Sequence, residues 1–213
     1  MNEPEITMID YGGSNLRSVQ KAFEAVGARV RYTADPETVR RAGRLVLPGV
    51  GAFGAGMAAM RARGLDEATA AAARSGASLL GICLGMQFLF DESEEMGHNE
   101  GLGLVPGRVV RFESPRAPEG RTLKVPHMGW NEIDHGGAHP LLEGVPRGAH
   151  AYFVHSFYCV PNDPDDVLAT ADYGAPFAAV VARENILGIQ FHPEKSQSVG
   201  LRILRNFVEL EGA

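Results

Sequence analysis

The sequence has few cysteines, no long apolar segment and no excess of basic residues. Two cysteines in 213 residues are too few for a disulfide-stabilised secreted domain. No apolar run approaches the roughly 18 residues that a membrane-spanning helix needs, and the acidic segment Met1–Glu5 is unlike a signal peptide. A net charge of -6 disfavours general binding to nucleic acid or to an anionic membrane surface. We therefore expect a cytoplasmic protein that binds neither nucleic acid nor membrane.

The composition is that of a globular protein. Hydrophobic residues make up 45% of the sequence and charged residues 22%, which permits a sizeable core and excludes a wholly disordered chain. The 26 glycines and 13 prolines are scattered between apolar runs, so no linker divides the sequence. We expect a single domain over residues 1–213.

The first half of the sequence alternates short apolar runs with amphipathic ones. The short runs predict strands at 6–9, 29–32, 45–47 and 78–82. The amphipathic runs predict helices at 16–26, 36–41 and 57–74, the last broken near Gly64. Strands that alternate with helices are typical of βαβ units and a mostly parallel sheet covered on both faces.

The second half is richer in strands. Strand-like runs occupy 105–113, 128–133, 151–160, 167–173 and 177–190, and a helical pattern returns at 198–210. We expect antiparallel strands that extend the first sheet or form a small second one. The fold class is α/β: a central, mostly parallel sheet flanked by helices, with added antiparallel strands in the C-terminal half.

Cys83 lies in the most informative stretch of the sequence. The predicted strand ending at Ile82 runs into Gly81-x-Cys83-x-Gly85 and then into a helix start, which is the thiol counterpart of a nucleophile elbow. Such a turn holds the side chain outward at the carboxyl edge of the sheet, and the helix N-terminus favours a thiolate. Cys159 lies in an apolar strand without glycines, so we assign it to the core. Cys83 is the candidate nucleophile.

His192 is the strongest candidate for the base that a cysteine nucleophile needs. It ends the predicted strand 186–191, and Pro193 then turns the chain so that the Glu194 carboxylate can reach the imidazole. Among the other histidines, His155 lies within a strand and could line a pocket. We predict a triad of Cys83, His192 and Glu194.

A tetrahedral intermediate also needs backbone N–H donors. The N–H of Leu84, directly after the nucleophile, is one candidate. The glycine-rich loop 48–54 after the third strand can supply another, because glycines let the main chain approach a ligand closely.

These motifs resemble those of the class I glutamine amidotransferases, whose signature is a Gly-x-Cys-x-Gly-x-Gln elbow with a distant His-Pro-Glu. This chain has both, at 81–87 and 192–194. The segments 10–16, 48–54 and 126–131 narrow the resemblance to glutaminase subunits that deliver ammonia to a (β/α)8-barrel cyclase, which forms an imidazole ring. The similarity runs from about residue 6 to residue 210 and implies the family's α/β fold.

The resemblance implies that glutamine is hydrolysed to glutamate and ammonia through a Cys83 thioester. The oxyanion donors would be the N–H of Leu84 and an amide in Gly49-Val50-Gly51. Gln87 and Glu95 would bind the substrate, Glu95 through the α-ammonium group, and the segment His155, Ser156 and Phe157 would meet its α-carboxylate. The sequence without the resemblance predicts only a solvated acidic helix end at 91–95. We expect no cofactor and no metal.

The resemblance also implies a heterodimer with the barrel cyclase. The implied interface residues are Asn15, Pro126, His127, Met128, Gly129, Trp130, Asn131 and Lys195. For the segment 126–131 a strand entry with a core tryptophan is the competing interpretation, since aromatic residues are enriched in both cores and interfaces.

Three other functions remain open at this stage. The chain could be the glutaminase of another synthase, such as one that makes CTP, because the elbow is shared among amidotransferases. It could be a Cys-His-Glu hydrolase that works without a partner. It could also be a non-catalytic relative that acts as an interaction module.

Overall fold

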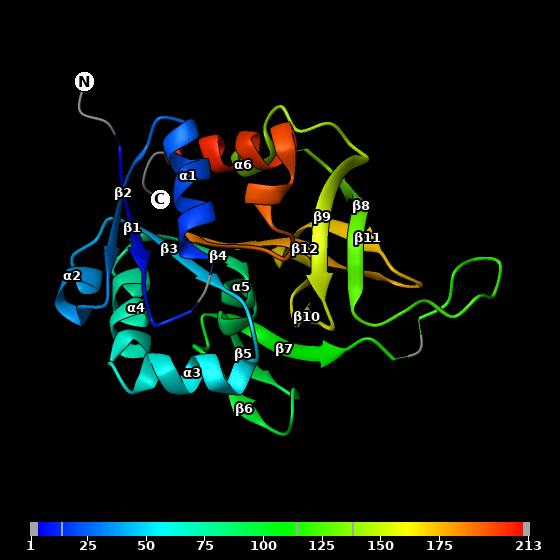
Figure 1. Ribbon diagram of the computed structural model, residues 1–213, viewed down its shortest axis with the longest axis horizontal. Helices are drawn as coiled ribbons and strands as arrows, with labels where there is room; N and C mark the ends of the chain where they lie inside the picture. The colour runs from blue at the N-terminus through cyan, green and yellow to red at the C-terminus, as the bar shows by residue number, and fades with distance from the viewer. Residues whose placement is uncertain (1–3, 14, 114, 138, 211–213) are drawn as a thin grey trace.

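The computed structural model describes residues 4–13, 15–113, 115–137 and 139–210. Within these residues a nine-stranded mixed sheet crosses the molecule, and a four-stranded sheet lies against one side of it (Figure 1). The strand order in the large sheet is β2-β1-β3-β4-β13-β12-β11-β8-β9. The order in the small sheet is β10-β7-β5-β6.

Parallel pairs join the first five strands of the large sheet. These strands are β2 (Arg29–Thr33), β1 (Glu5–Ile9), β3 (Arg44–Gly49), β4 (Ser78–Cys83) and β13 (Ile186–Ile189). β3, β4 and β13 are buried along almost their whole length, as expected for parallel strands covered on both faces. The carboxyl ends of β3, β4 and β13 therefore meet at one edge of the sheet.

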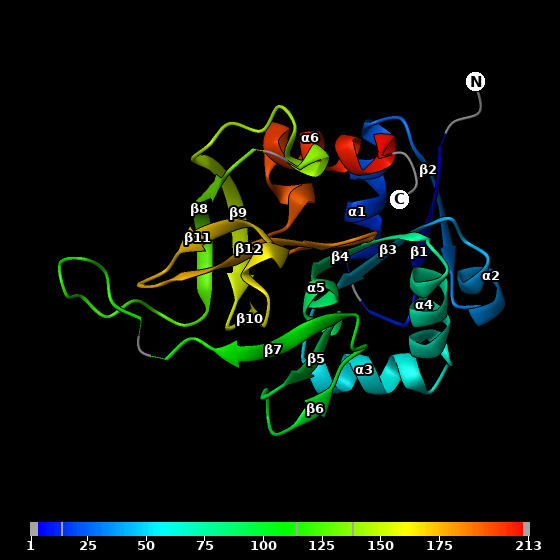
Figure 2. The ribbon, with the colours of Figure 1, turned by 180° about the vertical axis from the view of Figure 1, so that it is seen from behind.

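Helices cover both faces of the parallel part. On one face the apolar sides of α1 (Leu16–Ala25) and α6 (Gln197–Glu209) pack together through Phe23 and Phe207. The other face carries α2 (Pro36–Arg40), α3 (Phe53–Arg61), α4 (Leu65–Arg74) and the short α5 (Leu84–Phe88) (Figures 1 and 2). Gly64 separates α3 from α4 with a left-handed φ of 65°, a conformation that glycine adopts without strain.

Antiparallel pairs extend the large sheet, whereas the small sheet is mixed, with a parallel pair between β5 and β7. The large sheet is extended by β12 (Pro176–Arg183), β11 (Val167–Asp172), β8 (His127–His135) and β9 (Ala149–His155). The small sheet contains β10 (Phe157–Pro161), β7 (Val105–Arg111), β5 (Phe90–Ser93) and β6 (Asn99–Glu100). Short 3-10 turns lie at η1 (Pro140–Leu142), η2 (Pro164–Asp166) and η3 (Pro193–Lys195). The predicted fold class is confirmed.

Two sequence predictions of secondary structure are wrong. The predicted strand at 151–160 is two strands, because the chain passes from the large sheet to the small one at Ser156. The acidic segment 91–95 is not a helix end: Asp91 to Ser93 belong to β5, which pairs with β6 and β7. β10 pairs with the distant strand β7, whereas β5 pairs with the nearby strands β6 and β7, and the periodicity of a single segment reveals neither set of partners.

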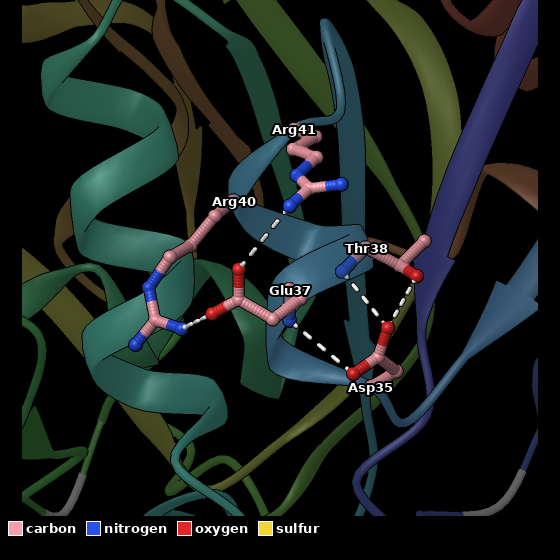
Figure 3. Close-up of polar contacts among 5 residues, drawn as sticks. All are labelled: Asp35, Glu37, Thr38, Arg40 and Arg41. Carbon is pink, nitrogen blue, oxygen red and sulfur yellow. Dashed lines mark hydrogen bonds and ion pairs between the residues drawn. The ribbon is translucent and has the colours of Figure 1, made fainter.

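Asp35 caps the N-terminus of α2 (Figure 3). Its carboxylate accepts hydrogen bonds from the N–H groups of Glu37 at 3.3 Å and Thr38 at 3.0 Å, and from the Thr38 hydroxyl at 2.5 Å. The bonds from Thr38 hold the pKa of Asp35 below its usual value. Glu37 contacts Arg40 and Arg41 one turn later, at 2.5 Å and 3.8 Å.

We predict that Asp35→Ala lowers the thermal midpoint slightly, since α2 loses the acceptor for its first N–H groups. Calorimetry measures the change, and Glu37→Gln is the control because its ion pairs are exposed and contribute little. An alanine variant as stable as the wild type, or one no less stable than Glu37→Gln, would contradict the capping role.

Among the residues that the structure describes, no helix is long and apolar enough to cross a membrane.

Candidate active site

Cys83 sits on a sharp turn between β4 and α5. It is 6% exposed and has φ 55° and ψ -110°, an unfavourable backbone conformation for a residue with a side chain. The flanking glycines make the turn possible. A Cβ at Gly81 would lie 2.5 Å from the Gly85 carbonyl oxygen, and one at Gly85 would lie 1.7 Å from that of Leu47. The local sequence therefore fixes where the thiol lies.

His192 and Glu194 form a buried pair beside Cys83. His192 follows β13, and its Nδ1 lies 2.8 Å from Glu194 Oε1. The same carboxylate oxygen accepts a hydrogen bond from the side-chain amide of Asn15 at 2.6 Å. Because Nδ1 is engaged by Glu194, the other ring nitrogen of His192 is left for its hydrogen bond with Cys83. The structure thus brings the three predicted triad residues together.

The electrostatics of this pair favour a charged imidazole. Burial lowers the pKa of His192, but hydrogen bonds with Cys83 and Glu194, together with their charges, outweigh that effect and raise it to about 9. Burial acts to raise the pKa of Glu194, yet the hydrogen bonds from His192 and Asn15 bring it below its usual value. The site can therefore hold a charged imidazole between Cys83 and the Glu194 carboxylate.

A cavity of about 310 Å³ opens beside the thiol. Its walls contain the predicted oxyanion residues Val50, Gly51 and Leu84, whereas Gly49 pairs with Cys83 across β3 and β4. They also contain every residue predicted to bind glutamine, namely Gln87, Glu95, His155, Ser156 and Phe157. The rest of the lining consists of Cys83, Pro126, Val154 and His192. The cavity is a suitable size for a small amino acid.

Two of the predicted glutamine-binding residues are themselves held by hydrogen bonds. The side-chain amide of Gln87 donates to the carbonyl of Phe157 at 3.0 Å. Glu95 Oε2 accepts from the N–H of Phe53 at 2.6 Å, at the first turn of α3. These bonds fix the two side chains in the cavity wall in advance of any ligand.

A profile of the family described as glutamine amidotransferase class-I matches residues 7–210. This chain belongs to the class I glutamine amidotransferases. The family indicated by the sequence motifs is therefore confirmed.

Relatives of this amidotransferase are similar to it over nearly their full length. It is 55% identical over 205 residues to the imidazole glycerol phosphate synthase subunit HisH of Syntrophotalea carbinolica, covering 96% of this chain and 100% of that protein. It is 50% identical over 204 residues to the HisH subunit of Salinibacter ruber, covering 96% of this chain and 94% of that protein. Among solved structures, PurLQS from Thermotoga maritima matches with a TM-score of 0.74 and 21% identity over 97% and 98% of the two chains. At that identity the likeness shows the fold alone.

An exposed apolar patch lies next to the active site of the amidotransferase. Met128 and Trp130 on β8 are 63% and 48% exposed, and they face Val154 and Tyr152 on β9. The rings of Trp130 and Tyr152 lie 6.0 Å apart, and Lys195 Nζ lies 5.6 Å from the centre of the Tyr152 ring. The carbonyl of Tyr152 accepts the N–H of His192 at 2.9 Å. A single hydrogen bond therefore links Tyr152 in the patch directly to His192 in the triad.

The other residues predicted for the interface lie in different surroundings. His127 is buried, because β8 turns alternate side chains inward, and its ring stacks 4.1 Å from that of Tyr173. Asn131 lies on the same side of the strand and donates to the carbonyl of Asp172 at 2.8 Å. Pro126 lines the cavity, Gly129 has a φ of 135°, and Asn15 contacts Glu194. The place of these residues in an interface stays a prediction.

His127 and His155 are both buried and form a neutral pair. His155 Nδ1 lies 2.8 Å from the Phe157 carbonyl, so it carries the proton, and its Nε2 accepts from His127 Nδ1 at 3.1 Å. Burial lowers the pKa of His155 to about 3 and that of His127 to about 4. Neither is placed to exchange protons near neutral pH, which leaves His192 as the acid–base candidate.

Sequence reasoning missed Tyr11, which lies under the glycine loop. A Cβ at Gly49 would come within 2.7 Å of the Tyr11 hydroxyl, so this position tolerates only glycine. Burial, and then the charge of Cys83, raise the pKa of Tyr11 to about 12. The only signal in the sequence was an aromatic residue in the turn after the first strand.

Within the described ranges 4–13, 15–113, 115–137 and 139–210, no group of three or more histidine, cysteine or acidic side chains is arranged to hold a metal ion.

Proposed function

We propose that this amidotransferase is the glutaminase subunit of an imidazole glycerol phosphate synthase, an enzyme of histidine biosynthesis. The observation that carries the proposal is the meeting of Cys83, His192 and Glu194 at a cavity of amino-acid size. The 55% and 50% identity to subunits of that name supports the choice of synthase.

In the proposed reaction the Cys83 sulfur attacks the side-chain amide carbon of glutamine. His192, which already carries the proton from the thiol, gives it to the departing nitrogen, so that the C–N bond breaks and ammonia leaves. A glutamyl thioester remains on Cys83. Water, deprotonated by His192, then attacks the thioester, and the thiolate leaves with the proton to restore the thiol. Glutamate is released, and Glu194 holds the imidazole in one orientation throughout.

Backbone N–H groups stabilise the negative charge on the amide oxygen in this scheme. Leu84 N–H is one donor, and a peptide of the Gly49–Val50–Gly51 loop supplies the other. Gln87 and Glu95 bind the substrate, with the Glu95 carboxylate on the α-ammonium group. The segment from His155 to Phe157 faces the α-carboxylate. The chemistry is carried by these residues without a metal or cofactor.

Ammonia passes to a (β/α)8-barrel cyclase that docks on the patch of Met128, Trp130, Tyr152 and Lys195. The patch exposes a tryptophan and a methionine beside a tyrosine, residue types that are enriched at protein interfaces. Its hydrogen bond to His192 supports a partner that sits directly over the active site.

Glutamate release tests the proposal. We expect slow turnover by the chain alone and faster turnover when a purified cyclase subunit and its nucleotide ligand are added, with ammonia appearing in the imidazole product. Equal turnover with and without the cyclase would contradict the choice of synthase and favour a hydrolase that needs no partner.

We predict that Trp130→Ala weakens cyclase binding at least about fivefold, because truncating aromatic anchors at interface centres costs more than about 1 kcal/mol. Isothermal calorimetry with the cyclase measures the affinity. Tyr32→Ala is a matched control, since Tyr32 is also a partly exposed aromatic residue but lies on β2, at the opposite edge of the sheet. Equal affinities of the two variants would contradict this interface.

A further inference from the structure

Gln190 is a fully buried polar residue that the proposed mechanism does not use. It follows β13 directly, two residues before His192, and its side chain is 0% exposed. Its backbone N–H donates to the carbonyl of Ala179 at 2.9 Å, which fixes the residue against β12. A buried amide is costly unless both of its ends are hydrogen-bonded.

The side chain of Gln190 lies between the nucleophile and the substrate site. Its Oε1 accepts a hydrogen bond from Gln87 Nε2 at 3.2 Å. Its Nε2 points at the sulfur of Cys83, at 3.9 Å. Gln190 thus connects the residue proposed to attack the substrate with one proposed to bind it.

The surrounding hydrogen bonds determine which end of the Gln190 amide faces the sulfur. The Phe157 carbonyl oxygen can only accept a hydrogen bond, so its partner on Gln87 is the amide nitrogen. The same nitrogen faces Gln190. Gln190 must then offer its oxygen to Gln87 and its N–H to Cys83. The His155 N–H, bound to the same Phe157 carbonyl, fixes that acceptor from the other side.

We infer that Gln190 is a positioning residue whose N–H holds the Cys83 sulfur as a thiolate directed toward the cavity. The inference rests on the proposed role of Cys83 as nucleophile. His192 contacts the sulfur from one side and the Gln190 N–H from another. An N–H donor stabilises a thiolate more than a thiol, and two partners restrict the side chain to one orientation.

The first test measures the alkylation of Cys83 by iodoacetamide as a function of pH, followed by mass spectrometry of the peptide. Gln190→Met keeps the length of the side chain but removes the N–H, and Gln190→Glu offers a carboxylate instead. We expect both to move the alkylation midpoint to higher pH and to slow alkylation at pH 7 by about tenfold. kcat should fall with the same pH dependence, while KM changes less. Gln20→Met, which removes an amide from the distant helix α1, is the control.

An unchanged alkylation midpoint in a folded Gln190→Met chain would overturn the inference. If that variant does not fold, NMR of the wild-type chain tests the inference instead. The Gln190 side-chain N–H signals should move with pH at the midpoint found for Cys83 alkylation, and signals that stay constant through it would overturn the inference. Alkylation needs no glutamine turnover, so these results are distinguishable from a failure of the proposed glutaminase function.

Discussion

The variant Cys83→Ala is expected to lose glutaminase turnover by a factor of about 10⁴ or more, since removing a covalent nucleophile leaves only binding and oxyanion stabilisation. The strained φ of 55° at this position should persist in the variant, because Gly81 and Gly85 determine the turn. Glutamate release in the presence of the cyclase and its ligand measures the loss.

Cys159→Ala is the matched control for this experiment. Cys159 is a fully buried thiol in β10, and burial raises its pKa well above the usual value, so it is not a nucleophile near neutral pH. We expect this variant to keep its turnover. Turnover by Cys83→Ala within tenfold of the wild type would contradict the thioester mechanism, and full retention of biological function would favour a non-catalytic interaction module.

The variant Glu194→Gln is expected to lower kcat by roughly 10³ to 10⁴, as an amide in place of the orienting carboxylate favours the wrong imidazole tautomer. In the wild type, Glu194 Oε1 is negatively charged and accepts hydrogen bonds from both His192 and Asn15. The neutral amide of the variant offers these two donors no negative charge. Glu92→Gln is the control, because it alters a His–Glu pair with His98 on the surface. A loss below tenfold in Glu194→Gln would contradict the orienting role.

The same variant should change how stability depends on pH. The pKa of His192 is raised from 6.5 to about 9 in the folded chain, so the folded state binds a proton that the unfolded state releases. The resulting stabilisation is fully present below pH 6.5 and is lost as the pH rises through about 9. Urea unfolding at pH 6, 7.5 and 9 should show this decline in the wild type and a shallower one in Glu194→Gln. Parallel curves would contradict the charged His192–Glu194 pair.

The sequence predicts the parallel strands β1 to β4 well because each βα unit is local. It does not predict that β13, from the C-terminal half where we expected antiparallel strands, lies parallel to β4. Strand, turn and amphipathic helix follow one another within about 30 residues, so periodicity and glycine positions suffice. The antiparallel half depends on pairing between distant segments. The passage at Ser156 from β9 to β10 has no local signal, since the apolar pattern continues through it.

The residues of the predicted site also differ in whether local sequence or distant contacts determine their positions. Cys83 and the His192–Glu194 turn belong to short motifs whose local geometry determines their chemistry. The contacts that support them are long-range: Asn15 is 179 residues from Glu194, and Gln190 is 107 residues from Cys83. His127 was expected at the surface with its neighbours, but a β-strand places adjacent side chains on opposite faces.

The turn that follows His192 also covers part of an open sheet edge. β9 is the last strand of the large sheet, and the free backbone groups of such an edge strand are a template for pairing with another chain. At Tyr152 both groups are occupied: the N–H donates to the Ser196 hydroxyl at 2.9 Å, and the carbonyl accepts from His192. Substitutions that loosen this turn therefore expose part of an open sheet edge, and reduced solubility is expected to accompany the loss of catalysis.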